Sequence, residues 1–351
     1  LGLERVEVEE ASAGDIVAFA GIERPQISDT ICDPQHPEPL LSLVVDEPTI
    51  SMTFEVNTSP FCGREGKFVT SRQIRERLLR EAMHNVALRV EETDDPDKFT
   101  VYGRGELHLG VLLENMRREG YELAVSRPRA VVKEIEGKLC EPYEVLTIDL
   151  DESSQGAVMQ ALGERGGQLT GMQPDGKGRV RLDYMIPSRG LIGFQTEFRT
   201  LTSGTGIMHH IFDHFGPVLD RQIAQRQNGV LISNSQGKAL AYALFNLQER
   251  GRLMIGPGDE VYEGQIVGIH SRDNDLVVNP LKAKKLTNIR AAGRDENIIL
   301  TPPVRFTLEQ AMEFIADDEL VEVTPTSIRL RKRFLKEHER RRAGRAEESD
   351  D

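Results

Sequence analysis

The stretch GRGELHLGVLLENMRREGYELAVSRP, from Gly103 to Pro128, decides how the rest of the sequence is interpreted. A glycine-rich turn is followed by an amphipathic run, whose apolar side chains recur at helical spacing until Gly120. Glycine is a common residue at a helix end, because it adopts the left-handed conformation without strain. Residues 121–125 then alternate between apolar and polar, which is typical of a half-buried strand. The stretch therefore predicts a turn, a helix and a strand in succession.

A second, diverged copy of this unit lies between Arg189 and Met208. Arg-Gly opens it, the segment that starts at Leu191 is apolar at helical spacing, and Gly204 precedes a short apolar strand. An internal repeat of one supersecondary unit indicates repeated domains. We therefore predict two domains of the same architecture.

Around these two copies, the pattern predicts the order strand, helix, strand, strand, helix, strand twice, which is the ferredoxin-like α+β sandwich. In the first copy Thr70 caps a helix, with Gln73 as its capping-box partner. In the second copy Ser153 or Ser154 caps the helix. The expected strands are 49–56, 87–91, 99–102 and 121–125 in the first copy, and 143–150, 169–172, 180–186 and 207–208 in the second.

The segments on either side of these copies differ from them. Short alternating stretches at 6–9 and 13–19 indicate strands that are too few to close a core, so we interpret them as the end of a β-barrel. Residues 213–335 contain short apolar runs separated by Gly, Asn or Pro, which is typical of a mostly-β domain. The strands expected there are 228–234, 239–247, 252–255, 260–269, 275–279 and 327–330, with one helix at 308–315 capped by Thr307.

The predicted fold class is therefore α+β multidomain. It consists of two tandem ferredoxin-like (βαββαβ) domains, preceded by the last strands of a β-barrel and followed by a mostly-β C-terminal domain. Small and charged residues end the chain, and we expect a disordered tail there. The predicted domains are 1–46 (end of the barrel), 47–127 and 128–212 (ferredoxin-like), 213–335 (mostly β) and 336–351 (charged tail).

The bulk composition is that of an ordinary globular protein, with 38% hydrophobic and 29% charged residues among 351. No apolar run approaches the roughly 18 residues of a membrane span, so we expect a cytoplasmic protein with no membrane partner. Cys32, Cys62 and Cys140 are widely spaced, which fits reduced thiols. The first residue is Leu1 rather than Met, so we expect a fragment or a processed form.

The net charge of −13 argues against a general nucleic-acid binder, but the charge is unevenly distributed. Residues 279–294, NPLKAKKLTNIRAAGR, contain basic residues and no acidic ones. Residues 329–345 are also mostly basic, and the alternation in 329–333 indicates a strand with one basic face. Charge segregated in this way is typical of proteins that meet phosphate locally.

The segment 279–294 is the main candidate for phosphate recognition. It has no steady apolar face, so we interpret it as a loop whose cations neutralise RNA phosphates and whose polar side chains reach sugar or base edges. A solvated charged loop is the alternative interpretation of the same composition. The candidate RNA-binding residues are Lys282, Lys284, Lys285, Asn288, Arg290 and Arg294.

We predict no catalytic, cofactor-binding or metal-ligating residues in this chain. No strand–GxxxxGK[ST]–helix P-loop occurs, and the turn at 103–105 lacks the dinucleotide-binding fingerprint. His209, His210 and His214 cluster, but no cysteine or carboxylate pattern supports a metal site there. No order of nucleophile, base and orienting residue is recognisable.

The amino-acid sequences of five stretches resemble the BipA-type (TypA) family of translational GTPases, and the resemblance runs along the whole chain. Elongation factor G is less similar, because its large fourth domain would lie between the two ferredoxin-like domains, where residues 125–143 leave no room. LepA-type factors also lack that domain but differ near the C-terminus. The five stretches are SPFCGREGKFVTSRQI from Ser59, GRGELHLGVLLENMRREGYELAVSRP from Gly103, PDGKGRVRLDYMIPSRGLIGF from Pro174, AQRQNGVLISNSQGKA from Ala224 and LKAKKLTNIRAAGRDE from Leu281.

This resemblance implies a monomeric, ribosome-associated protein that assists assembly of the large subunit and acts in stress and cold adaptation. It implies that the full-length protein uses GTP and Mg²⁺, and that hydrolysis is stimulated by the ribosome. It also implies that the C-terminal domain reaches rRNA and the acceptor end of the A-site tRNA, with the six candidate residues as the contacting element. The GTPase domain of such proteins would lie upstream of Leu1, so we expect this chain neither to bind nor to hydrolyse GTP.

Two alternative functions predict different features. An autonomous enzyme with an unrecognised pocket would need a cluster of titratable groups in a cleft. A protein-interaction scaffold that uses acidic surfaces would bind its partners independently of RNA and with little sensitivity to salt.

Overall fold

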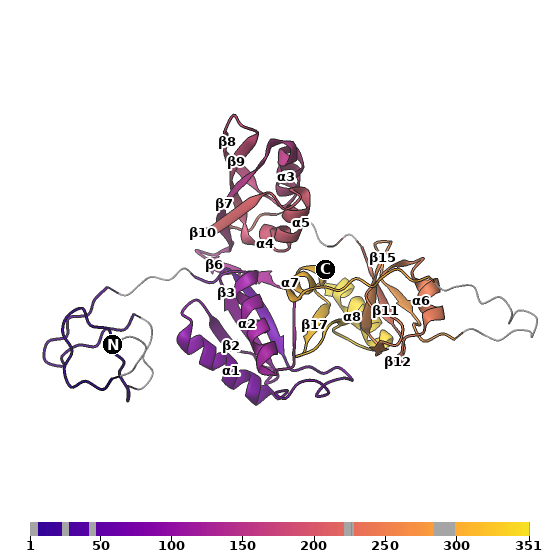
Figure 1. The fold of residues 1–351 in the computed structure, drawn as a ribbon, viewed down its shortest axis with the longest axis horizontal. Coiled ribbons are helices and arrows are strands. Elements are labelled where there is room, and N and C mark those ends of the chain that lie inside the picture. The colour runs from indigo at the N-terminus through magenta and orange to yellow at the C-terminus, as the bar shows by residue number, and fades with distance from the viewer. Residues whose placement is uncertain are drawn as a thin grey trace, which may run out of the picture.

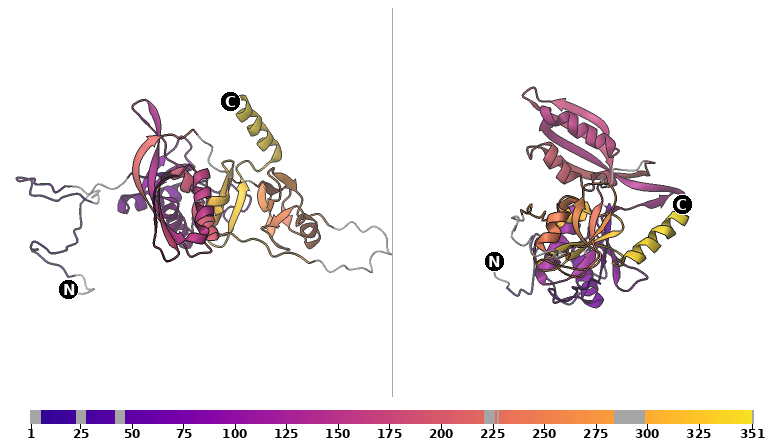
Figure 2. Two further views of the ribbon diagram at one scale, coloured as in Figure 1. Left: turned by 90° about the horizontal axis from the view of Figure 1, so that it is seen from above. Right: turned by 90° about the vertical axis from the view of Figure 1, so that its right-hand side faces the viewer.

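The computed structural model describes residues 6–22, 28–41, 47–220, 226, 228–283 and 299–350, with side chains as far as residue 345. We call residues 47–130 the first unit, residues 133–217 the second unit and the described residues from 228 to 345 the third unit. The first and third units lie next to each other, and the second unit stands to one side of both (Figures 1 and 2). The predicted α+β class is confirmed.

The first unit is an antiparallel sheet in the order β4-β1-β3-β2, with two helices that pack on it. Apolar residues alternate along β1 and β3, so one side of each strand faces the helices. A short strand β5 pairs with the start of β1. The elements are β1 (Ile50–Glu55), α1 (Ser71–His84), β2 (Arg89–Glu92), β3 (Lys98–Gly103), α2 (Glu106–Glu119), β4 (Leu123–Val125) and β5 (Arg129–Ala130).

The second unit has its own core and an antiparallel sheet in the order β10-β7-β9-β8. The predicted cap at Ser153 or Ser154 was wrong, because Asp151 precedes the first helical residue and both serines lie inside the helix. The elements are β6 (Lys133–Ile135), β7 (Lys138–Asp151), α3 (Glu152–Glu164), β8 (Gln168–Pro174), β9 (Arg179–Pro187), α4 (Ser188–Leu191), α5 (Phe194–Leu201) and β10 (Ile207–Pro217).

The third unit is rich in short strands, as the turn residues between its apolar runs predict. Thr307 and Gln310 form the capping box of the helix that was expected at 308–315. The elements are β11 (Val230–Ser233), β12 (Gly237–Lys238), α6 (Ala241–Leu247), β13 (Gly251–Leu253), β14 (Glu260–Val261), β15 (Gln265–His270), β16 (Leu276–Val278), α7 (Leu308–Phe314), β17 (Glu319–Val323), β18 (Ile328–Lys332) and α8 (Glu337–Asp350).

One sheet runs through both the first and the third unit, which the sequence did not indicate. Strand β17 pairs antiparallel with β4, with Val321 opposite Val125, and β18 then connects β17 to β15. The core residues of both units form one hydrophobic cluster, in which α7 packs near α2. The two units are therefore joined by backbone hydrogen bonds as well as by side chains.

Three other predictions were wrong. Residues 239–247, expected as a strand, form α6, because alanine and leucine favour helix and a short apolar run does not distinguish the two. The described residues of 1–46 contain no strand, and strands there would have lacked partner strands. The tail expected to be disordered forms α8, which extends away from the third unit (Figure 2) and carries an Arg341–Glu337 pair one turn apart.

The second unit meets the other two where α2 and α5 begin. The backbone N–H of Gly193 donates to Oε2 of Glu106 at 3.3 Å. Burial, with the Glu313 carboxylate nearby, raises the pKa of Glu106 to about 7. Burial also raises the pKa of Glu313, which lies on α7. The junction with the second unit therefore contains two poorly solvated carboxyl groups, one from the first unit and one from the third unit.

Changing Gly120 to alanine is expected to lower the free energy of unfolding by about 1 kcal/mol, because a side chain in the left-handed region is strained. Gly120 ends α2 with a φ of 99°, and its N–H bonds the carbonyl of Arg117. The matched control is Gly156→Ala within α3, where an added Cβ meets nothing and alanine favours helix. Thermal denaturation should therefore move in opposite directions for the two variants, and equal shifts would contradict this explanation.

Candidate nucleic-acid interface

The basic segment 279–294 leaves the third unit through a turn held against the residues before α6. Oδ1 of Asn279 accepts the N–H of Leu281 at 2.9 Å, and the Pro280 carbonyl accepts the N–H of Leu240 at 3.0 Å. A Cβ added to Gly237 would lie 2.4 Å from Cδ2 of Leu281. Glycine at this position therefore lets the leucine pack against the backbone and fixes the first end of the segment.

The chain returns to the third unit at the other end of α6. The Gln248 side chain donates to the Ile299 carbonyl at 3.1 Å and accepts the N–H of Thr301 at 3.1 Å. Leu300 packs on the core of the third unit, as Leu281 does at the first end. One helix and the residues that flank it therefore hold the chain at 279–281, where the segment begins, and at 299–301, beyond the segment.

Exposed cations lie beside both ends. Lys282 is exposed, and it forms no ion pair with another described residue. Lys238 follows Gly237 at the first end, and Arg250 follows Gln248 and the acidic Glu249 at the second end. Sequence analysis missed Lys238 and Arg250, because they lie outside the basic run and only tertiary contacts bring them to it.

The structure places one of the six predicted RNA-binding residues. Lys282 lies at the first end of the segment with its side chain toward solvent. The other five lie outside the described residues: Lys284, Lys285, Asn288, Arg290 and Arg294.

The second basic stretch, 329–345, is divided between the core and the surface. The side chains of Arg329, Arg331 and Lys332 on β18 are 15%, 1% and 3% exposed, so they cannot form the basic face that the alternation predicted. Acidic partners from distant parts of the chain explain their burial, since a buried cation needs a paired anion. The exposed cations of this stretch are Arg333, Lys336, Arg341, Arg342 and Arg345.

Lys332 illustrates this pairing. Its Nζ lies 3.0 Å from the fully buried Glu319, which also accepts two hydrogen bonds from Arg226. Burial would raise the pKa of Glu319, but the bonds from Arg226 and the charge of Lys332 outweigh it and lower that pKa. The pKa of Lys332 is raised, because Glu319 and Asp318 outweigh its burial.

A second buried cluster joins the first and third units through Glu322 on β17. Its carboxylate accepts hydrogen bonds from the Tyr262 hydroxyl at 2.5 Å, from Asn57 at 3.1 Å and from Arg329 at 3.0 Å. Asn57 also donates to the fully buried Glu122 at 2.8 Å. These bonds fix the loop at 57–66 against the third unit.

The histidines that cluster in the sequence are distributed along β10. Nδ1 of His210 lies 2.5 Å from the Glu144 carboxylate, and this hydrogen bond raises the pKa of His210. His214 pairs with Asp213 and stacks on the Tyr143 ring. No group of three or more His, Cys, Asp or Glu side chains in the described ranges is placed to hold a metal ion.

Comparison with known proteins identifies the family. The family described as "TypA/BipA C-terminal domain" matches residues 228–337, and the one described as "Elongation factor G C-terminus" matches residues 138–226. The chain is 67% identical over 350 residues to the "Large ribosomal subunit assembly factor BipA" of Escherichia coli (strain K12). The chain belongs to the TypA/BipA family. It spans 58% of the length of that relative, and the alignment covers 100% of this chain.

Other TypA/BipA proteins of the same name are similar to a comparable extent. Identity is 65% over 345 residues with the Haemophilus influenzae protein and 59% over 348 residues with that of Buchnera aphidicola. These alignments cover 98% and 99% of this chain, and 56% and 57% of the relatives. The TypA/BipA C-terminal match contains both ends of the basic segment and α6. No helix among the described residues has the length and hydropathy of a membrane span.

Proposed function

We propose that this chain is the ribosome- and tRNA-binding part of a BipA-type translational GTPase that assists assembly of the large subunit. The observation that carries the proposal is the basic segment: its first residues, and the chain at 299–301 beyond it, are anchored on the family's C-terminal domain, and Lys282 is exposed to solvent. Support also comes from relatives, 67% identical along the whole chain, that are named large ribosomal subunit assembly factors. The full-length protein would use GTP and Mg²⁺ and act as a cytoplasmic monomer in stress and cold adaptation.

The segment 279–294 would contact rRNA and the acceptor end of the A-site tRNA. Its lysines and arginines neutralise phosphates without reading sequence, and Asn288 can bond sugar or base edges. The proposed contact residues are Lys282, Lys284, Lys285, Asn288, Arg290 and Arg294. Lys238 and Arg250 would add charge at the two ends of the segment.

We further propose that the first and second units are both ferredoxin-like domains, with bounds near 47–127 and 128–212. Apart from the short strands β5 and β6 and the four-residue helix α4, each has the element order βαββαβ, and the strand orders β4-β1-β3-β2 and β10-β7-β9-β8 correspond position by position. In this arrangement the sheet shared with the first unit holds the third unit firmly. The basic segment would then meet the ribosome in a fixed orientation.

Neutralising Lys282, Lys284 and Lys285 to alanine is expected to weaken binding of this chain to 70S ribosomes and to flatten its salt dependence. Each lost phosphate contact should reduce the slope of log affinity against log salt by about one. The measurement is co-sedimentation with ribosomes across a series of salt concentrations.

The matched control changes three exposed cations of the first and second units, Arg72, Arg80 and Lys177, to alanine. This control alters the net charge equally and should leave the slope almost unchanged. Equal slopes for the two triple variants would show that another surface docks the chain. No binding by the unchanged chain would overturn the proposal that it binds ribosomes.

The purified chain is expected to show no GTP hydrolysis, with or without ribosomes. Its sequence contains no P-loop to hold the phosphates and no recognisable nucleophile–base arrangement. Release of radiolabelled phosphate from GTP measures this directly. Turnover that persists through repeated purification would contradict the assignment.

A further inference from the structure

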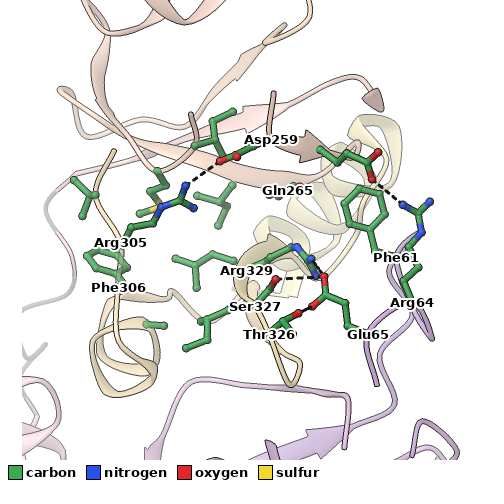
Figure 3. Close-up of a pocket in the computed structure, with 18 of the residues that line it drawn as sticks. Phe61, Arg64, Glu65, Asp259, Gln265, Arg305, Phe306, Thr326, Ser327 and Arg329 are labelled. Carbon is green, nitrogen blue, oxygen red and sulfur yellow. Dashed lines mark hydrogen bonds and ion pairs between the residues drawn. The ribbon is translucent and has the colours of Figure 1, made fainter. Parts of the chain in front are cut away.

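A cavity of about 540 Å³ lies between the first and third units, and none of the residues that line it belongs to the basic segment. Such a volume falls in the usual range of small-ligand sites. The loop at 57–66 forms one wall, and the residues around Arg305 form the opposite one (Figure 3). Apolar side chains such as Ile255, Ile266 and Leu330 line part of the space.

Gln265 is a polar side chain of this pocket whose amide donor makes no hydrogen bond to the surrounding described residues. The residue is 5% exposed, and its Oε1 accepts the Tyr262 N–H at 3.2 Å. Its Nε2 has no hydrogen-bond partner among the described residues, yet it is not closed off from solvent. A buried amide usually bonds both of its ends. Because Gln265 lines the cavity and its amide donor is not closed off, a ligand in the cavity can accept a hydrogen bond from it.

The carboxylates of the pocket are already engaged. Glu65 accepts hydrogen bonds from Thr326 at 2.5 Å and from Arg329. Burial would raise the pKa of Glu65, but these bonds and that of Thr324 lower it to about 2. Asp259 accepts from the Gly256 N–H and from Arg305. The polar groups left for a ligand are therefore mainly donors, which favours a ligand rich in acceptors.

Planar side-chain groups lie on two opposite sides of the pocket. The Arg64 guanidinium lies over the Phe61 ring, 4.3 Å from its centroid. On the opposite side, Phe306 packs on Phe314 with ring centroids 5.0 Å apart and is itself half-buried. Nucleic-acid bases stack on aromatic rings and on arginine planes in this way.

The arginines at the mouth are held loosely. Arg64 pairs with Glu260 at 3.0 Å and Arg305 pairs with Asp259 at 3.1 Å, with side chains 48% and 67% exposed. Exposed ion pairs of this kind contribute little to stability, so a phosphate can replace the carboxylate partner.

We propose that this pocket binds one nucleotide, either an unstacked residue of single-stranded RNA or a free nucleoside monophosphate. The base would lie between Phe306 and the Arg64–Phe61 stack, with Gln265 donating to it and Arg64 or Arg305 meeting the phosphate. This site uses none of the residues of the basic segment and does not rest on the ribosome-binding proposal. It needs none of the GTP-specific motifs that the sequence lacks.

The test is fluorescence anisotropy of labelled oligouridylate and oligoadenylate with the full chain, with UMP and AMP as competitors. Phe306→Leu keeps an apolar wall but removes the ring, and should weaken binding about tenfold. Gln265→Glu keeps the acceptor for the Tyr262 N–H, replaces the free donor with an oxygen, and should also weaken binding. Arg305→Glu changes an exposed side chain and so tests the site without threatening the fold.

The matched control is Arg72→Glu on α1, which makes the same charge change at an 83% exposed side chain outside the pocket. Competition by UMP or AMP would identify a free nucleotide as sufficient, and binding of oligonucleotides alone would identify RNA. The proposal is overturned if no probe binds, or if Arg305→Glu and Arg72→Glu bind alike. It is also overturned if only the Lys282, Lys284 and Lys285 variant loses binding, because the basic segment would then account for it.

Discussion

Replacing Glu322 with alanine is expected to lower the free energy of unfolding by about 3–5 kcal/mol, because buried donors lose their acceptor. The Glu322 carboxylate is fully buried and is bonded by Tyr262, Ser59 and Arg329. Arg329 would keep its ion pair with Glu65 but would lose its ion pair with Glu322. Since Ser59 belongs to the first unit, the loss should loosen the contact between the first and third units.

Urea denaturation followed by far-UV circular dichroism measures this change. Glu322→Gln keeps one acceptor and should fall between the alanine variant and the unchanged protein. Glu249→Ala removes an exposed carboxylate of the third unit and should change stability by less than about 0.5 kcal/mol. If Glu322→Ala and Glu249→Ala were equally mild, the buried polar cluster would contribute little to the contact between the two units.

Raising the pH from 5 to 8 is expected to destabilise the junction around Glu106 by about 2 kcal/mol. The pKa of Glu106 is about 7 in the folded protein, against an ordinary value of 4.5. The folded state therefore holds a proton that the unfolded chain releases earlier. This contribution is fully present below pH 4.5 and is lost as the pH rises through 7. The full shift corresponds to roughly 3 kcal/mol, and the partly exposed side chain reduces it.

The Glu106→Gln variant separates this group from its neighbours. Glutamine keeps an acceptor for the Gly193 N–H and carries no proton to lose, so the pH dependence of stability should become flatter. Glu313, His210 and Arg165 also face Glu106 and remain in the variant. Stability curves at pH 5 and pH 8 make the comparison, and identical pH dependence in both proteins would show that Glu106 is not the titrating group.

Local signals in the sequence were sufficient for many elements. The capping boxes of Thr70 and Thr307 and the glycine at 120 act within a few residues, so the pattern alone locates those helix ends. The same kind of signal failed at α6, because a short run of mainly apolar residues fits either a helix or a buried strand.

Pairings between distant segments were not predictable. The alternation in 121–125 predicts that Glu122 faces solvent. The loop at 57–66 covers it instead, and the Glu122 carboxylate accepts hydrogen bonds from Asn57 and from the Gly66 N–H. Likewise, the acidic groups that pair with the buried Arg329 and Lys332, such as Glu65 and Asp275, lie far from them in the sequence, so the local pattern did not indicate the burial. Of the proposed interface, the basic run was visible in the sequence, whereas its anchoring by α6 was not.

The pairing of β4 with β17 also determines the order in which the fold can be completed during synthesis. Val125 is made long before its partner Val321. In the interval, β4 is an open sheet edge, and open edges pair readily with strands of other chains. The nascent protein must therefore protect this edge, or remain shielded, until its last strands emerge. The unit that is made first is thus among the last to complete its sheet.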